Sequence, residues 1–204
     1  MALTEACAAI TELVTRSAAS GQVPLVVAFD GRSGAGKSML ASRVAEAVRA
    51  AVVLLDDFFA ASIPNAEWDR MTAEECGARV FDWARVRAQA VGPLRAGKTA
   101  CWHPFDFETG PRANGTYGMK TTAVEVEPAS VIIIDGAYSS GPQLADLVDL
   151  TVLIETSETE RWTRLTRREE AEFLAQWHAR WTAVEDFYFS NVRPRSSFDL
   201  IVTT

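Results

Sequence analysis

The amino-acid sequence predicts an α/β fold in which helices cover both faces of a five-stranded parallel sheet. Short, continuously apolar runs recur along the chain, and helical stretches separate them. A glycine-rich loop follows the first of these runs directly, at the edge where open parallel sheets bind ligands. The 204 residues suit a single domain, 1–204, with room for a small lid.

The expected strands are runs too apolar for one exposed face, so both faces should be covered. They are Leu25–Phe29, Val52–Leu55, Val131–Ile134, Leu150–Ile154 and Phe198–Val202. The first run opens at Pro24, and the third ends in an acid, Asp135. Because the strands are parallel, their carboxyl ends meet at one edge of the sheet.

Helical periodicity accounts for most of the rest of the chain. The expected helices cover residues 3–18, the stretch from the glycine loop to about Arg49, a mostly polar segment at roughly 66–96, and a long region at 158–189. On the first helix, Leu3, Cys7, Ile10 and Val14 share one apolar face. A hairpin pairing Thr99–Trp102 with Thr122–Val126 is expected within residues 97–127.

Composition excludes several classes of partner. The formal charge of −7 disfavours nucleic acid, whose phosphates need clustered Lys and Arg. No stretch is long and apolar enough to span a bilayer, and the N-terminus lacks the pattern of a signal peptide. The three cysteines have no metal-ligand spacing, so reduced thiols and a cytoplasmic location are expected. The sequence leaves open whether the chain forms a homo-oligomer.

The glycine loop predicts nucleotide binding. Gly31-Arg32-Ser33-Gly34-Ala35-Gly36-Lys37-Ser38 matches the pattern GxxxxGK[ST], between a strand and a helix. Its backbone N–H groups would converge on phosphate oxygens, with Lys37 on the β- and γ-phosphates and Ser38 on Mg²⁺. We expect these eight residues and Met39 to bind the cofactor. The absence of an NKxD or TKxD motif favours ATP over GTP.

Carboxylates follow two of the strands. Asp56 ends the second strand and is the candidate base that accepts the proton of a hydroxyl substrate. Its neighbour Asp57 should point to the other face of the strand, and the choice between the two stays open. They could also merely end the strand or cap a helix. Asp135 lies where the acid that holds the metal or its waters is expected, beside Ser38.

Four arginines cluster in the segment RWTRLTRRE. On a helix, Arg161, Arg164 and Arg168 share one face, where they could close over ATP. We expect Arg164 and Arg168 to act on the transferring phosphoryl group with Lys37. The alternative is a solvated face whose arginines pair with neighbouring glutamates.

These residues together resemble the uridine kinase family, within the group that includes phosphoribulokinase and pantothenate kinase. The similarity runs from about residue 24 to the end. Its pieces are Asp30-GRSGAGKS, Asp56–Phe59, Phe81-Asp82-Trp83, Ala96-Gly97-Lys98, Pro104–Phe107 with Thr109 and Arg112, Val126–Val131, Asp135-Gly136, and the arginines 161, 164 and 168.

The resemblance implies a P-loop kinase three-layer sandwich with strand order 2-3-1-4-5, ATP-Mg²⁺ as the phosphoryl donor, Asp56 as the base and an arginine lid at 158–175. It also implies that the hairpin segment 102–112 closes the acceptor pocket. The expected substrate-binding residues are Asp57, Phe59, His103, Phe105, Asp106, Arg112 and Arg161.

The sequence departs from uridine kinases where the nucleoside is bound. Gly110 stands at the position of a base-contacting histidine, and Phe105 at that of a tyrosine. Lost polar recognition indicates a different acceptor. We therefore expect a kinase that phosphorylates a hydroxyl of a small molecule, nucleoside-like or another alcohol. The alternatives are a nucleoside monophosphate kinase, with Arg70, Arg79 and Arg112 available for a substrate phosphate, and a non-catalytic ATP-binding module.

Overall fold

The computed structural model describes residues 3–21, 23–168 and 180–204, and its centre is a five-stranded parallel sheet. The strands are β1 (Leu25–Asp30), β2 (Ala51–Leu54), β5 (Val131–Asp135), β6 (Leu150–Glu155) and β7 (Leu200–Thr203). Their order across the sheet is β2-β5-β1-β6-β7, which is 2-3-1-4-5 when they are counted along the chain. The expected α/β fold class and strand order are confirmed.

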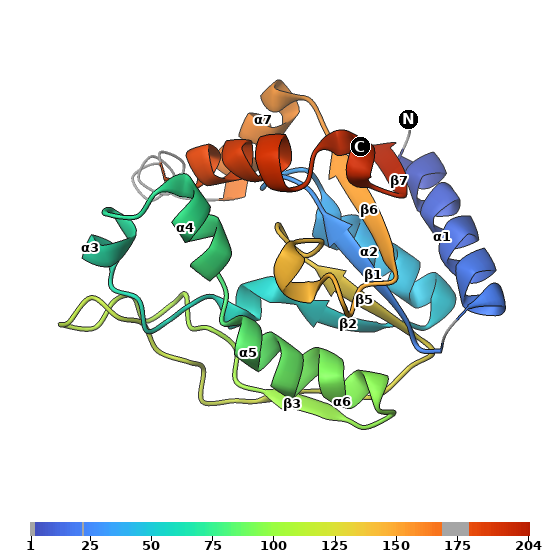
Figure 1. Cartoon of the computed structure of the whole chain (residues 1–204), viewed down its shortest axis with the longest axis horizontal. Helices are drawn as coiled ribbons and strands as arrows, with labels where there is room; N and C mark the ends of the chain where they lie inside the picture. The colour runs from blue at the N-terminus through green and yellow to red at the C-terminus, as the bar shows by residue number, and fades with distance from the viewer. Residues whose placement is uncertain (1–2, 22, 169–179) are drawn as a thin grey trace.

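Short and long helices surround this sheet (Figure 1). The α-helices are α1 (Leu3–Ser20), α2 (Lys37–Val48), α3 (Asn65–Trp68), α4 (Ala73–Arg79), α5 (Trp83–Arg85), α6 (Gly92–Arg95) and α7 (Glu158–Arg168), and helical residues resume at 180–187. The 3₁₀ turns are η1 (Leu55–Phe58), η3 (Pro142–Leu144) and η5 (Arg195–Ser197), and the π-helical turns are η2 (Val86–Val91) and η4 (Tyr188–Val192). Strands β3 (Ala100–Trp102) and β4 (Val124–Val126) form the expected antiparallel hairpin.

The apolar strands build a core on each side of the sheet, because successive side chains of a strand point to opposite faces. Val27 and Ile133 belong to a core that α1 and α2 cover. Val26 and Ile132 belong to a second core, which includes side chains from α3 to α6 and from β3. In Figure 1, α1 and α2 accordingly lie on the opposite side of the sheet from α5, α6 and β3.

The expectation of a mostly polar segment at 66–96 is wrong in its polarity. The segment is helical, but its helices are short and supply buried side chains to the second core, among them Trp68, Val86 and Leu94. Helices α3 and α4 are too short for an amphipathic period to stand out, and residues 83–95 run without a break through α5, the π-helical turn η2 and α6, where the π register interrupts the 3.6-residue period.

The chain does not run straight from strand β2 into extended backbone. Asp56 and Asp57 lie in the 3₁₀ turn η1, so the expected alternation of strand side chains does not apply to them. The expected helical region at 158–189 is described as α7 and, after residue 179, as helix and π-helical turn. The part of the expected lid at 169–175 lies outside the described residues.

Candidate active site

The glycine loop joins β1 to α2 in a conformation that requires glycine. The φ angles of Gly34 and Gly36 are 78° and 92°, in the left-handed region. At Gly31, a Cβ atom would lie 2.2 Å from the carbonyl oxygen of Ile154 on β6. Gly36 is the N-cap of α2 and offers no side-chain cap, so the first N–H groups of that helix are available to an anion.

Asp30, at the end of β1, fixes the start of this loop. Its buried carboxylate accepts hydrogen bonds from the backbone N–H groups of Gly31, Tyr138 and Ser140, at 2.7, 2.9 and 3.1 Å. It also accepts bonds from the hydroxyls of Ser140, at 2.5 Å, and Tyr188, at 2.7 Å. Burial, and next the negative charge of Asp30, raise the pKa of Tyr188, which keeps its hydroxyl a donor.

A cavity of about 400 Å³ lies against the loop, and we call it the phosphate cavity. Its described lining residues are Ser33, Gly34, Gly36, Lys37, Ser38, Met39, Leu54, Asp56, Asp135, Gly136, Ala137, Arg164 and Leu165. Lys37 Nζ donates to the carbonyl oxygens of Gly31 and Arg32, at 2.9 and 3.1 Å. The predicted phosphate-binding lysine therefore lies folded along its own loop.

Asp135, the last residue of β5, fits the predicted role of a metal-site acid. Its side chain is nearly buried and hydrogen-bonds with Ser38, yet Oδ1 contacts no partner among the described residues. Burial raises the pKa of Asp135, while the positive charge of Lys37 opposes that rise. A buried, unpartnered carboxylate oxygen beside a hydroxyl offers the hard oxygen ligands that Mg²⁺ or its waters prefer.

The two acids of η1 contact different surroundings. Asp56 is exposed and lines the phosphate cavity. Asp57 lines none of the described cavities, and its Oδ2 accepts a hydrogen bond of 2.8 Å from Nε1 of Trp102 on β3. Burial raises the pKa of Asp57, and the Trp102 hydrogen bond partly offsets that effect. The geometry favours Asp56 over Asp57 as the acid next to a phosphate.

Helix α7 packs directly on the glycine loop. Arg164 lines the phosphate cavity, lies 3.4 Å from the carbonyl oxygen of Gly34, and donates to Thr204 Oγ1 at 3.0 Å. It also pairs with Glu160 at 2.9 Å, which matches the alternative of arginine–glutamate pairs on the same helix. Arg168 ends the described part of α7, and its side chain lies outside the described residues.

Arg161 was expected to bind substrate together with the hairpin segment 102–112, but among the described cavities it lines a different one from Phe105 and Phe107. Its guanidinium donates to the carbonyl of Ser33 at 2.9 Å and to the carboxylate of Glu185 at 3.2 Å. Ser33 belongs to the phosphate loop and Glu185 to the C-terminal helical segment. Arg161 therefore connects these two elements.

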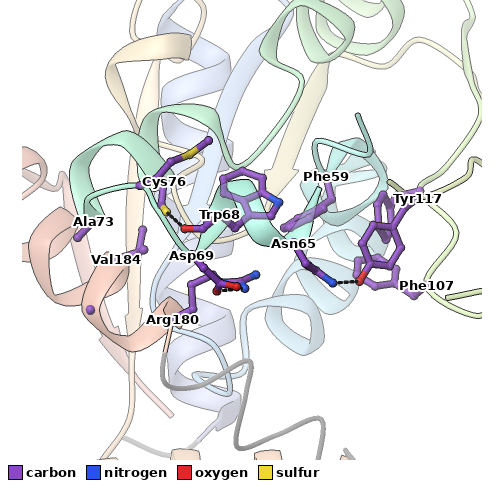
Figure 2. A pocket seen from close by; sticks show the side chains of 13 residues that line it. Phe59, Asn65, Trp68, Asp69, Ala73, Cys76, Phe107, Tyr117, Arg180 and Val184 are labelled. Carbon is purple, nitrogen blue, oxygen red and sulfur yellow. Dashed lines mark hydrogen bonds and ion pairs between the residues drawn. The ribbon is translucent and has the colours of Figure 1, made fainter. Parts of the chain in front are cut away.

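A second cavity, of about 600 Å³, lies on the hairpin side, and we call it the aromatic cavity (Figure 2). Its described lining residues are Phe59, Asn65, Trp68, Asp69, Met71, Ala73, Cys76, Phe105, Phe107, Tyr117, Arg180, Ala183 and Val184. Of the residues predicted to bind substrate, only Phe59 and Phe105 are among them. The predicted hairpin segment 102–112 therefore borders this cavity through its phenylalanines.

The other predicted substrate residues on the hairpin side have local partners. Asp106 accepts hydrogen bonds from the backbone N–H groups of Glu108 and Thr109. His103 is exposed, with Nδ1 3.0 Å from the carbonyl oxygen of Lys120. Arg112 is exposed and lines none of the described cavities. These three side chains support or border the hairpin loop, and their roles as substrate contacts stay predictions.

Several lining residues of the aromatic cavity lie on elements that no sequence pattern predicts. Asn65 and Asp69 belong to or follow the four-residue helix α3, and Arg180 begins the helix after the segment 169–179. Tyr117 lies in the hairpin loop. The one signal in this group that a sequence offers is Trp68 on α3, a large aromatic residue.

Comparison with known proteins agrees on the fold. No protein-family model and no curated protein matches the chain. Among solved structures, a possible uridine kinase from Bacillus stearothermophilus aligns with a TM-score of 0.69 and 18% identity, over 98% of this chain and 99% of that one. D-glycerate 3-kinase from Cryptococcus neoformans aligns with a TM-score of 0.68 and 16% identity, over 98% and 95%.

The chain has a uridine kinase-like P-loop kinase fold. A candidate fructose transport system kinase from Silicibacter sp. TM1040 shares this fold, with a TM-score of 0.61 and 20% identity over 96% of this chain and 98% of that one. Identities of 16 to 20% leave the acceptor of this P-loop kinase fold to be argued from its own residues. In the described part of the chain, no helix is both long and apolar enough to cross a membrane.

Proposed function

We propose that this protein is an ATP-dependent kinase that transfers the γ-phosphoryl group of ATP to a hydroxyl of a small molecule. One observation carries the proposal: a single cavity gathers Lys37, Ser38, Asp56, Asp135 and Arg164 around the glycine loop. These side chains come from α2, η1, β5 and α7. Phosphoryl transfer needs this combination of phosphate-binding cations, metal-binding oxygens and a base.

Each residue has a distinct part in the reaction. The loop N–H groups and Lys37 bind the β- and γ-phosphates, and Lys37 exchanges its loop carbonyls for phosphate oxygens. Arg164 reaches the same cavity and stabilises the charge of the transferring group. Ser38 and Asp135 would hold Mg²⁺, which neutralises phosphate charge when bound.

Asp56 orients the acceptor hydroxyl and takes its proton. The acceptor oxygen forms a bond to the γ-phosphorus while the bond from that phosphorus to the β–γ bridging oxygen breaks, and ADP leaves. The acceptor would reach Asp56 from the aromatic cavity, since Phe59 lines that cavity three residues after Asp56. A third cavity of about 710 Å³, lined by Arg32 and Ala35 among others, offers room for the nucleoside part of ATP.

The two alternative functions have weaker support. A nucleoside monophosphate kinase needs arginines for the substrate phosphate, but Arg70, Arg79 and Arg112 are absent from the described lining of the aromatic cavity, and the one arginine of that lining, Arg180, pairs with Asp69. Arg79 instead pairs with Glu67 at 3.0 Å. A non-catalytic ATP-binding module has no need for a carboxylate such as Asp56 in the phosphate cavity.

The test is release of ADP from ATP-Mg²⁺ across a panel of alcohols: nucleosides, sugars, ring alcohols and pantothenate-like alcohols. Lys37→Ala should abolish turnover while the fold persists, because Lys37 binds phosphate and does not pack in the core. The exposed Lys98→Ala is its matched control and should be fully active. Normal ATP binding and turnover by Lys37→Ala would contradict the proposal.

The same assay tests the base. Asp56→Asn should lower turnover by a factor on the order of 10² to 10⁴, the usual contribution of a general base, with ATP affinity little changed. Asp57→Asn is its neighbour control. Full activity of Asp56→Asn together with a large loss in Asp57→Asn would move the role of base to Asp57.

A further inference from the structure

The aromatic cavity is walled by flat rings from three parts of the chain. The ring centroid of Phe105 lies 5.1 Å from that of Phe59, 4.4 Å from that of Phe107 and 5.1 Å from that of Tyr117. The ring centroid of Trp68 lies 5.8 Å from that of Phe59. Such walls favour a flat ligand ring by stacking and burial.

The charged groups of the cavity neutralise each other. Among the described lining residues, Arg180 is the one cation and Asp69 the one anion. Arg180 donates to Asp69 Oδ1 at 2.5 Å, and Figure 2 shows the two side chains against each other. Asp69 is largely exposed, so the pair lies at the open side of the cavity. An uncharged ligand leaves the pair intact, whereas a carboxylate or phosphate would compete with Asp69 for Arg180. The cavity therefore suits an uncharged ligand.

Most other polar groups of the described lining have partners within the protein. Asn65 Nδ2 donates to the hydroxyl of Tyr117 at 3.1 Å, and Cys76 Sγ contacts the carbonyl oxygen of Trp68 at 3.7 Å. A ligand with many hydroxyls, such as a ribose or a hexose, would find few open partners. The ligand body should therefore be largely apolar.

Trp68 is the exception. Its side chain is only 1% exposed, it lines the cavity, and its Nε1–H has no hydrogen-bond partner among the described residues. In Figure 2 the indole nitrogen lies on the side of the ring toward Phe59 and Asn65. Buried N–H groups in proteins nearly always have a partner, so an orphaned one on a cavity wall points to a ligand that supplies the acceptor.

Resting on the proposed kinase function, we propose that the aromatic cavity binds an uncharged alcohol built on a flat, largely apolar ring that carries a hydrogen-bond acceptor. Trp68 Nε1 donates to that acceptor and so selects the substrate. The hydroxyl group of the ligand extends past Phe59 toward Asp56, because Phe59 lines the aromatic cavity and directly follows the turn η1, which carries Asp56.

The experiment compares two probes that differ in one ring atom: quinoline-3-methanol, with a ring-nitrogen acceptor, and naphthalene-2-methanol, without it. Glycerate and uridine 5′-monophosphate are the anionic comparisons. ADP release gives kcat/KM for each, and quenching of tryptophan fluorescence gives binding in the absence of turnover. We expect kcat/KM for the quinoline to exceed that for the naphthalene by about 3- to 10-fold, the range for one neutral hydrogen bond.

Trp68→Phe keeps an aromatic ring and removes the donor, so it should bring the ratio of the two probes to about one. Trp83→Phe is the matched control, because Trp83 Nε1 donates to the carbonyl of Ala78 at 2.8 Å and lies outside the described lining. Its ratio should equal that of the unaltered protein. If Trp68→Phe fails to fold, the ratio measured with the unaltered protein decides.

The outcomes separate the two proposals. Preference for the anionic alcohols, or a quinoline-to-naphthalene ratio near one in the unaltered protein, would overturn the assignment of the ligand while leaving the kinase function intact. If no alcohol releases ADP, the kinase function fails. Trp68-dependent binding of the quinoline would then still support the assignment, and its absence would overturn it.

Discussion

The carboxylate of Glu185 accepts a hydrogen bond of 2.7 Å from the backbone N–H of Ser33 in the glycine loop. Glu185 is 2% exposed, and its second oxygen lies 3.2 Å from Arg161 and 3.8 Å from Arg32. One buried acid thus holds the phosphate loop, helix α7 and the C-terminal helical segment together. The loop is positioned by charge as well as by its glycines.

Glu185→Gln should lower the free energy of unfolding by about 1.5 to 3 kcal/mol, the range for hydrogen bonds to charged groups. The amide oxygen can still accept from Ser33, but Arg161 and Arg32 lose a charged partner. Urea unfolding measures the change. The exposed Glu125→Gln on β4 is the control, and equal stability of the two variants would show that the buried acid does not hold these elements.

Asp57→Asn should raise the melting temperature at neutral pH. Burial raises the pKa of Asp57 above its ordinary value of 3.8, so the folded state binds that proton more tightly than the unfolded chain. The contribution of Asp57 to the free energy of unfolding is therefore largest below pH 3.8 and decreases as pH rises through the raised pKa.

Asparagine removes the buried charge and still offers an oxygen to Trp102 Nε1. The increase in melting temperature of Asp57→Asn over the unaltered protein should become smaller as pH falls toward 3.8, where Asp57 becomes protonated in both the folded and the unfolded state. Thermal unfolding across this pH range measures it. A gain that is independent of pH, or a loss at neutral pH, would contradict the prediction.

Asp135→Asn should raise the Mg²⁺ concentration required for half-maximal ADP release by about 10- to 100-fold. The reason is the unpartnered Oδ1 next to Ser38, which a neutral amide replaces poorly as a ligand. Binding of ATP without Mg²⁺ should change little. Asp146→Asn, on an exposed acid paired with Arg87, is the control, and an unshifted Mg²⁺ dependence in Asp135→Asn would place the metal elsewhere.

Uridine and cytidine should be poor substrates. Phe105, at the position of a tyrosine in uridine kinases, is a buried ring without a polar atom. Gly110 has only open space within 4 Å of where its Cβ would be, and it lies outside the described lining of the aromatic cavity. Stacking alone discriminates weakly between bases. A steady-state assay that gives a micromolar KM for uridine with ordinary turnover would contradict this prediction.

The sequence alone was sufficient for the sheet and the phosphate loop, because both depend on local patterns. Continuous apolar runs predicted the strands, and GxxxxGKS between a strand and a helix predicted the loop. Different surroundings for Asp56 and Asp57 were expected, but for a reason that does not hold, because the chain turns into 3₁₀ helix at Leu55. The expected rule of strand alternation was wrong there.

The rest of the aromatic cavity, beyond the predicted Phe59 and Phe105, and the Glu185 contacts were beyond sequence reasoning for a different reason. Ser33 and Glu185 are separated by 152 residues, and no sequence motif links the two positions. Trp68, Tyr117 and Arg180 meet only after helices and a hairpin have packed. Their pairing depends on tertiary structure, which periodicity does not encode.

The carboxylate of Asp30 sets an order of events during synthesis. Its partner Tyr188 follows 158 residues later, so the glycine loop leaves the ribosome long before that hydroxyl exists. Until then, a carboxylate destined for full burial lacks one of its donors, and the end of β1 is held less firmly. The hydrogen bonds that fix the end of β1 are therefore complete only after the C-terminal helical segment has docked, so the glycine loop is fully supported only when most of the chain has been made.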